Sequence, residues 1–183
     1  MGLSLRNVTL RLYRGEKCVF EDLGEMLFTH FGVSGPLVLS ASALMRKGSP
    51  EDYRLEIDLK PGLTPEQLDK RIQRDLAESP NRDLGNILHA LLPAKLILPV
   101  LRLCGIAPDT KANTLTKAQR LTLGGCIKAV SLHVRAFREK LPQRLARHPA
   151  QRQIIVLLPV FRKQFDKRQP VSYTHLTLPT NSL

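Results

Sequence analysis

Hydrophobic and polar residues alternate in three stretches of the chain, residues 3–13, 53–59 and 128–137. A period of two places successive side chains on opposite faces of an extended strand, so each stretch predicts a half-buried strand. Two shorter apolar segments, residues 16–21 and 25–29, predict further strands. The side chains expected to point inward include Val8, Leu10, Leu12, Tyr53, Leu55, Ile57, Leu59, Val130, Leu132, Val134 and Ala136.

A helical period replaces the alternation in the middle of the chain. Thr64 and Gln67 have the spacing of a capping box, with Pro65 at the first helical position. Thr116 and Gln119 repeat this capping box at the start of the last helix. The first of these helices is expected to bury an apolar stripe formed by Leu68, Ile72 and Leu76.

Two more apolar helical segments, residues 86–92 and 93–104, complete this block. Pro99 removes a backbone N–H, so we expect it to kink or split the second segment. Strands before and after a helical block predict an α+β fold, a small antiparallel β-barrel with a nested α-helical subdomain. The barrel is expected over residues 1–62 and 128–138, and the helical subdomain over residues 63–127.

One segment combines a strand, a glycine-framed turn and the start of a helix. Gly32 and Gly35 can adopt positive φ, Ser34 is a good N-cap, and Pro36 suits the first helical turn. We expect the helix over residues 37–45. Backbone N–H groups at a helix start lack intrahelical partners and bind phosphate, carboxylate or flavin oxygens. Either this turn only reverses the chain, or it also binds such a group.

The residues of this segment resemble a known enzyme family. Residues 24–44, GEMLFTHFGVSGPLVLSASAL, resemble part of the BaiN/RdsA-like (YhiN-like) family of NAD(P)- and FAD-dependent oxidoreductases, also called the aminoacetone oxidase family of FAD-binding enzymes. Residues 2–12 look like the strand that opens the family's inserted domain, and residues 115–134 like the segment that leads out of it. The resemblance implies that this chain is the insert domain of a flavoprotein with two dinucleotide-binding domains.

The resemblance also implies a function and a site. In the parent enzyme, hydride would pass from NAD(P)H to FAD and on to an unsaturated or carbonyl acceptor, or an amine would be oxidised. His30 is the candidate catalytic proton donor, because an imidazole titrates near neutral pH. The alternative is that His30 only forms a hydrogen bond across the turn. The residues expected to bind the cofactor or line the substrate are Thr29, Phe31, Gly32, Ser34 and Gly35, and no metal is expected.

A dinucleotide-binding fingerprint is missing from the chain. It has 11 glycines, but no G-x-G-x-x-G follows a predicted strand. We therefore expect a fragment whose partners are the FAD-binding domain of the same polypeptide and a small-molecule substrate. The fragment alone is expected to retain no cofactor and to be inactive. No apolar run is long enough for a membrane span and no signal-peptide core is present, so we expect a cytoplasmic protein without membrane contact.

The C-terminal part departs from the family pattern. Residues 139–170 hold eight Lys or Arg against two Asp or Glu, half of the net charge of +12. Either the reading frame slips near Arg138, or a divergent basic helix at residues 143–152 precedes an apolar strand at residues 154–161. Residues 171–183 contain VSYTHLTLPT, which resembles a translated sequencing adapter, so we leave this tail out of the fold.

The basic charge leaves a second function open, a stand-alone β-barrel that binds RNA. Aromatic residues make up only 5% of the chain, there is no tryptophan, and the aromatics do not alternate with Lys or Arg along one strand face. Base-stacking platforms need such aromatics. The sequence therefore favours the flavoprotein over nucleic-acid binding.

Three cysteines, Cys18, Cys104 and Cys126, are far apart in the chain. An odd number without C-x-x-C spacing predicts neither a disulfide framework nor a zinc site. We expect them to be small buried residues, with a redox-active thiol as the alternative.

Overall fold

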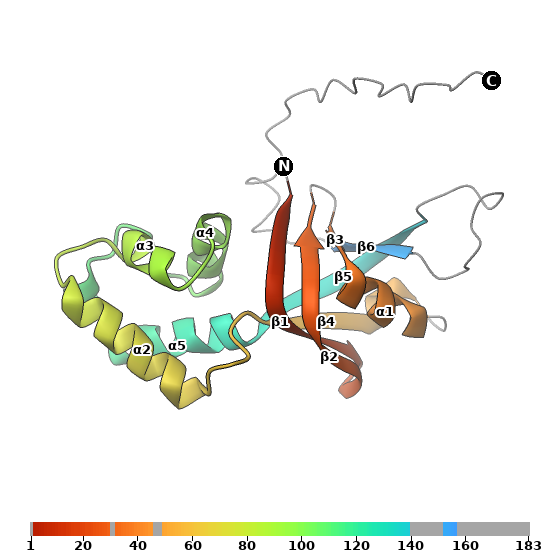
Figure 1. Ribbon diagram of the computed structural model, residues 1–183, viewed down its shortest axis with the longest axis horizontal. Coiled ribbons are helices and arrows are strands. Elements are labelled where there is room, and N and C mark those ends of the chain that lie inside the picture. The colour runs from red at the N-terminus through yellow and green to blue at the C-terminus, as the bar shows by residue number, and fades with distance from the viewer. Residues whose placement is uncertain (1, 30–31, 46–48, 140–151, 157–183) are drawn as a thin grey trace, which may run out of the picture.

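The computed structural model describes residues 2–29, 32–45, 49–139 and 152–156. Six strands close into a barrel in the order β1, β2, β3, β6, β5, β4 (Figure 1). All neighbouring strands are antiparallel. This confirms the predicted α+β fold with an antiparallel barrel. The strands are β1 (Leu3–Arg14), β2 (Lys17–Phe28), β3 (Val33–Ser34), β4 (Tyr53–Asp58), β5 (Val130–Glu139) and β6 (Arg152–Val156).

The barrel interior is filled by the inward positions that the alternation predicted. Except for Ala136, which is half-buried, every predicted inward side chain is at most 7% exposed. Met26 and Phe28 of β2 join this core at 1% and 3% exposure. Burying one such side chain stabilises the fold by roughly 1.5–3 kcal/mol, so the predicted pattern accounts for much of the barrel's stability.

The prediction of two separate strands at residues 16–21 and 25–29 is wrong in one respect, because both segments belong to the single strand β2. β1 pairs with β2 along its whole length, and the intervening Leu23 and Gly24 lie opposite Thr9 and Val8. The pairing register shifts between Leu5 and Val8, where Asn7 adopts a φ of 53°. This bulge in β1 accompanies the continuous pairing of β2 through residues 22–24, where the sequence pattern predicted a gap between two strands.

The helical subdomain lies on one side of the barrel and α1 (Pro36–Leu44) on the other (Figure 1). Both predicted capping boxes are present: Gln67 N–H donates to Thr64 Oγ1 at 3.2 Å, and Gln119 N–H donates to Thr116 Oγ1 at 3.2 Å. The subdomain contains α2 (Pro65–Glu78), α3 (Leu84–Ile87), the 3₁₀ turn η2 (Leu88–Ala90), α4 (Ala94–Leu103), the 3₁₀ turn η3 (Ala112–Thr114) and α5 (Lys117–Lys128).

Two details of the helical prediction are corrected. The helix expected at residues 86–92 is divided between α3 and η2. α4 is not split at Pro99, which lies inside a continuous helix and is buried. Burial of the proline ring against its neighbours offsets the single hydrogen bond that the ring removes.

An ion pair joins α2 to α5. Arg120 Nε donates to Asp69 Oδ1 at 2.6 Å, and Arg120 Nη2 donates to Asp69 Oδ2 at 3.3 Å. The hydrogen bond from Arg120 lowers the pKa of Asp69 below its ordinary value. Because the folded pKa is depressed, the pair stabilises the fold fully above the unfolded pKa of about 3.9 and loses this contribution as the pH falls further.

Replacing Asp69 by asparagine is therefore expected to lower the free energy of unfolding at pH 7 by up to about 1 kcal/mol, because the pair is partly exposed. The same variant should lose less stability than the wild type between about pH 5 and pH 2. Urea unfolding across this range measures both effects. Asp109→Asn is the matched control, since Asp109 is exposed and its side chain forms no hydrogen bond or ion pair with the described residues. Parallel pH profiles for wild type and Asp69→Asn would contradict the assignment.

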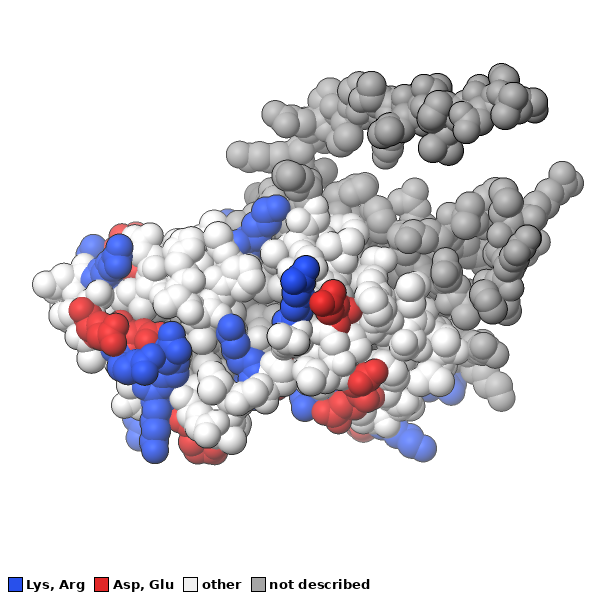
Figure 2. Space-filling view, in the orientation of Figure 1, with Lys and Arg blue, Asp and Glu red and all other residues white. Residues whose placement is uncertain are grey.

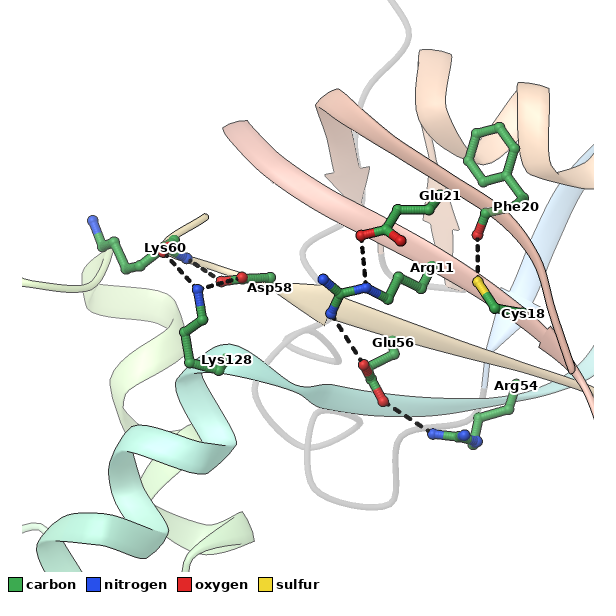
Figure 3. Close-up of polar contacts among 9 residues, drawn as sticks. All are labelled: Arg11, Cys18, Phe20, Glu21, Arg54, Glu56, Asp58, Lys60 and Lys128. Atoms are coloured by element: carbon green, nitrogen blue, oxygen red, sulfur yellow. Dashed lines mark hydrogen bonds and ion pairs between the residues drawn. The ribbon is translucent and has the colours of Figure 1, made fainter. Parts of the chain in front are cut away.

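A buried ion pair joins the two chain segments that connect the barrel to the helical subdomain, the end of β4 and the end of α5 (Figure 3). Lys128 Nζ pairs with Asp58 Oδ2 and donates to the carbonyls of Lys60 and Leu63 at 3.1 and 2.8 Å. Asp58 Oδ1 also accepts a hydrogen bond from Lys60 N–H at 2.8 Å. Alternation with the inward Ile57 and Leu59 places Asp58 on the outer face of the strand, but this is wrong, because Asp58 is 3% exposed. Its partner Lys128 lies 70 positions away, so a local pattern does not reveal it.

β6 supplies the last wall of the barrel. It pairs with β5 on one side and with β3 on the other, and Ile154 lies opposite both Phe137 and Val33. Of the apolar strand expected at residues 154–161, residues 154–156 are described, and they belong to β6. Most of the basic helix expected at residues 143–152, and the tail, lie outside the described residues. A slip of the reading frame stays a prediction.

Candidate functional site

The turn at the end of β2 carries the residues expected to be functional. Thr29 N–H donates to the carbonyl of Gly32 at 2.7 Å, and Thr29 Oγ1 donates to the same carbonyl at 3.0 Å. These two bonds close the connection between β2 and β3. His30 and Phe31, which complete the turn along the chain, lie outside the described residues. The structure thus brings Thr29 and Gly32 together.

The N-cap of the helix after this turn is a glycine and not the predicted serine. Ser34 lies in β3, opposite Leu27, and is 6% exposed. The N-cap of α1 is Gly35, with φ 102° and ψ 175° and without a side-chain capping bond. A Cβ at Gly35 would lie 3.0 Å from Met26 Cα. Close packing of this backbone on β2 therefore requires glycine at the N-cap, and α1 begins at Pro36, one residue before the expected start at residue 37.

The first turn of α1 leaves little amide surface for an anion, which favours the alternative in which this turn only reverses the chain. Leu37 and Val38, whose N–H groups would point out of the first turn, are 3% and 0% exposed. Pro36 is exposed but has no N–H. Of the candidate residues at this end, Thr29, Gly32 and Gly35 are half-buried and uncharged. These three residues can pack against a planar ring, but they themselves offer no charge to a phosphate.

A cation of the helical subdomain reaches the same end of the barrel. Lys95 Nζ on α4 lies 3.5 Å from the carbonyl of Gly2, which precedes β1. The Gly2 backbone in turn packs on the end of β2, since a Cβ there would lie 2.8 Å from the Phe28 carbonyl. No local sequence pattern marks Lys95, because only the tertiary contact between α4 and the chain before β1 brings it here.

The described residues contain no Rossmann-type dinucleotide cradle. Phosphate cradles for dinucleotides sit between a parallel strand and the helix that follows it. Every strand pair described here is antiparallel. Nor do three or more His, Cys, Asp or Glu side chains of the described ranges gather where they could hold a metal ion.

The outer face of the barrel carries a chain of alternating charges across three strands (Figure 3). Arg11 Nε on β1 donates to Glu21 Oε1 at 2.9 Å, and its Nη1 donates to Glu56 Oε1 at 3.3 Å. Glu56 Oε2 also accepts from Arg54 Nη1 at 3.2 Å. Burial acts to lower the pKa of Arg11, but the hydrogen bonds and charges of the two glutamates raise it. The network is fully paired, so we interpret it as a stabilised outer surface.

The cysteines differ in their surroundings. Cys18 is exposed on β2, which corrects the prediction of a buried residue, and its Sγ donates to the Phe20 carbonyl at 3.3 Å. Cys104 and Cys126 are half-buried against the hydrophobic core. Burial and a hydrogen bond with Cys126 raise the pKa of the Cys104 thiol. A raised pKa keeps a thiol protonated and unreactive, as expected for a packing residue.

A closed antiparallel barrel with a helical subdomain nested between its strands defines a two-part α+β domain. The chain belongs to the HI0933-like family: residues 1–141 match the HI0933-like protein barrel and H2TH domain. This confirms the family resemblance drawn from the sequence.

One curated relative is the 3-dehydro-bile acid delta(4,6)-reductase of Clostridium scindens. It is 31% identical to this chain over 107 residues, which are 57% of this chain and 26% of the relative. The matched part is therefore about a quarter of the relative's length. None of the helices in the described ranges is long and apolar enough to cross a membrane.

Proposed function

We propose that this chain is a domain of a flavin-dependent oxidoreductase and that it lies over the substrate side of the flavin. The observation that carries the proposal is the similarity over 107 residues to a protein named as a reductase. The antiparallel topology supports a division of labour, in which a dinucleotide-binding domain of the same polypeptide holds FAD. In this proposal the present chain alone retains no FAD and is inactive.

The residues at the Thr29–Gly35 end of the barrel suit a position over the substrate side of the flavin. FAD, when bound, supplies hydride transfer between NAD(P)H and an unsaturated or carbonyl substrate. The uncharged surface of Thr29, Gly32 and Gly35 would exclude water from the reacting face and orient a flat substrate. The bonds from Thr29 to the Gly32 carbonyl hold the turn in shape. Phe31 and Ser34 belong to the same segment.

His30 is the residue that we assign to proton transfer. It lies in the chain between Thr29 and Gly32, and it is the one imidazole of this segment. An imidazole exchanges a proton near neutral pH, which suits protonation of a substrate carbon or oxygen after hydride transfer.

Replacing His30 by alanine in the complete polypeptide is expected to lower turnover of the acceptor by at least about tenfold. This corresponds to an increase of about 1.4 kcal/mol in the activation free energy. Reduction of the flavin by NAD(P)H should be unchanged, because the proton is needed only in the second half-reaction. Stopped-flow absorbance of the flavin separates the two half-reactions.

His133→Ala is the matched control, since His133 is exposed on β5. It should leave both half-reactions unchanged. If His30→Ala lowers stability but not turnover, His30 has a structural role in the turn. If the complete polypeptide carries no flavin when purified, the proposed function itself is wrong.

A further inference from the structure

An open hollow in the helical subdomain lies away from the barrel end. It has a volume of about 640 Å³, within the range of small-molecule sites. The C-terminal half of α2, the loop that follows it, and α3 with η2 form its walls. The lining combines arginines and other polar groups with two small apolar contacts, Ile87 and Ala90.

Two arginines of the lining are held in place by one carboxylate. Arg71 Nε donates to both Asp75 oxygens at 2.9 Å, and Arg74 Nη2 lies 3.5 Å from Asp75 Oδ1. The side chain of Asp75 is only 11% exposed. The Nη groups of Arg71 form no hydrogen bond with the described residues. Asp75 thus orients a guanidinium whose outer edge remains available to an acceptor.

A third arginine has no side-chain partner among the described residues. Arg82 lies on the loop after α2, and its backbone is tied on both sides: its N–H donates to the Ser79 carbonyl, and its carbonyl accepts from Ala112 N–H, each at 3.1 Å. The adjacent Asp83 pairs with Lys111 at 2.7 Å. A rigid loop therefore presents a guanidinium to the hollow.

Two further side chains with hydrogen-bond donors line the hollow on α3 and η2. Asn86 and His89 line the hollow, and their side chains also lack partners within the described ranges. Asp75 is compensated by Arg71 and Arg74, and Glu78 lies 3.8 Å from Arg74. Three arginines against two carboxylates leave the lining positive, with Arg82 as the cation that has no counter-charge.

From these contacts we propose that the hollow binds the phosphate groups of a nucleotide-sized small molecule. Guanidinium groups match phosphate oxygens with paired N–H donors, and the Asn86 amide and His89 imidazole can bind the remaining polar edge. Ile87 and Ala90 provide the apolar contact for a ring. The inference is independent of the proposed flavin chemistry.

The charge pattern favours a small ligand over a nucleic acid. Figure 2 shows acidic and basic side chains side by side over the end of the molecule where α2 lies. A bound polynucleotide needs a continuous basic track along its backbone. Here the acidic residues Asp75 and Glu78 lie between Arg74 of α2 and Arg82 of the following loop.

Isothermal titration of the purified chain with ADP tests the proposal. We expect ADP to bind at least about tenfold more tightly than adenosine, and Arg82→Gln to weaken ADP binding by at least about tenfold. Arg102→Gln, an exposed arginine of α4, is the matched control and should bind ADP as the wild type does. Arg82 makes no side-chain contact that folding would need, and circular dichroism checks this.

A second measurement needs no variant. Bound ADP should protect Arg82, but not Arg102, from modification by phenylglyoxal, as read by peptide mass spectrometry. Equal affinity for ADP in wild type and Arg82→Gln would overturn the proposal, as would equal binding of adenosine or citrate. Absence of ADP binding at about 5 mM would also overturn it. A short RNA that binds more tightly than ADP, with loss in Arg82→Gln, would assign the hollow to nucleic acid instead.

Discussion

Replacing Lys128 by methionine is expected to lower the free energy of unfolding by about 3–5 kcal/mol. The Lys128 ammonium pairs with Asp58, and its other bonds go to the carbonyls of Lys60 and Leu63. Methionine keeps an apolar stem of similar length, so the loss is that of the charge. The Asp58 carboxylate would stay buried with one remaining hydrogen bond, from Lys60 N–H. Urea denaturation followed by circular dichroism measures the loss.

Lys60→Met is the matched control, because only the backbone of Lys60 takes part in this cluster. It should change stability by less than about 0.5 kcal/mol. The double variant Asp58→Asn with Lys128→Met should recover part of the loss, since a neutral amide costs less to bury than an unpaired carboxylate. If Lys128→Met and Lys60→Met were equally stable, the ion pair would not hold the two parts of the domain together.

Replacing Gly35 by alanine is expected to destabilise the chain by about 3 kcal/mol. The dihedral angles of Gly35, φ 102° and ψ 175°, lie in a region that only glycine occupies readily. The new Cβ would also lie 3.0 Å from Met26 Cα and 3.2 Å from Leu27 N, which are backbone atoms that cannot rotate away. Urea unfolding measures the effect. The substitution should also displace α1 from β2.

Gly62→Ala provides the comparison, since a Cβ at Gly62 meets no atom within 4 Å and its φ is not positive. It should be neutral, or stabilising by about 0.4–1 kcal/mol because the unfolded chain loses freedom. A loss below about 1 kcal/mol in Gly35→Ala would mean that the turn and helix start adjust easily. The proposal that this turn is held in a fixed shape for contact with the flavin would then be weakened.

Local patterns predicted the parts of this fold that depend on nearby residues. Alternation predicted the buried face of β4, because a strand that packs on one side needs an apolar side chain at every second position. The capping boxes at Thr64 and Thr116 marked the starts of α2 and α5, because a capping bond spans only three residues. For the candidate site, the sequence correctly placed a glycine turn between a strand and a helix.

Contacts between distant residues decided the rest. β2 continues past Leu23 because β1 pairs with it throughout, and Asp58 is buried because Lys128 meets it from the other end of the helical block. The N-cap of α1 is Gly35 and not Ser34, because the Gly35 backbone packs on Met26. The hollow around Arg82 needs α2 and η2 to face each other. The sequence by itself determined the periodic elements and their caps, and the tertiary structure decided which polar groups are buried, paired or open, because that depends on atoms far apart in the chain.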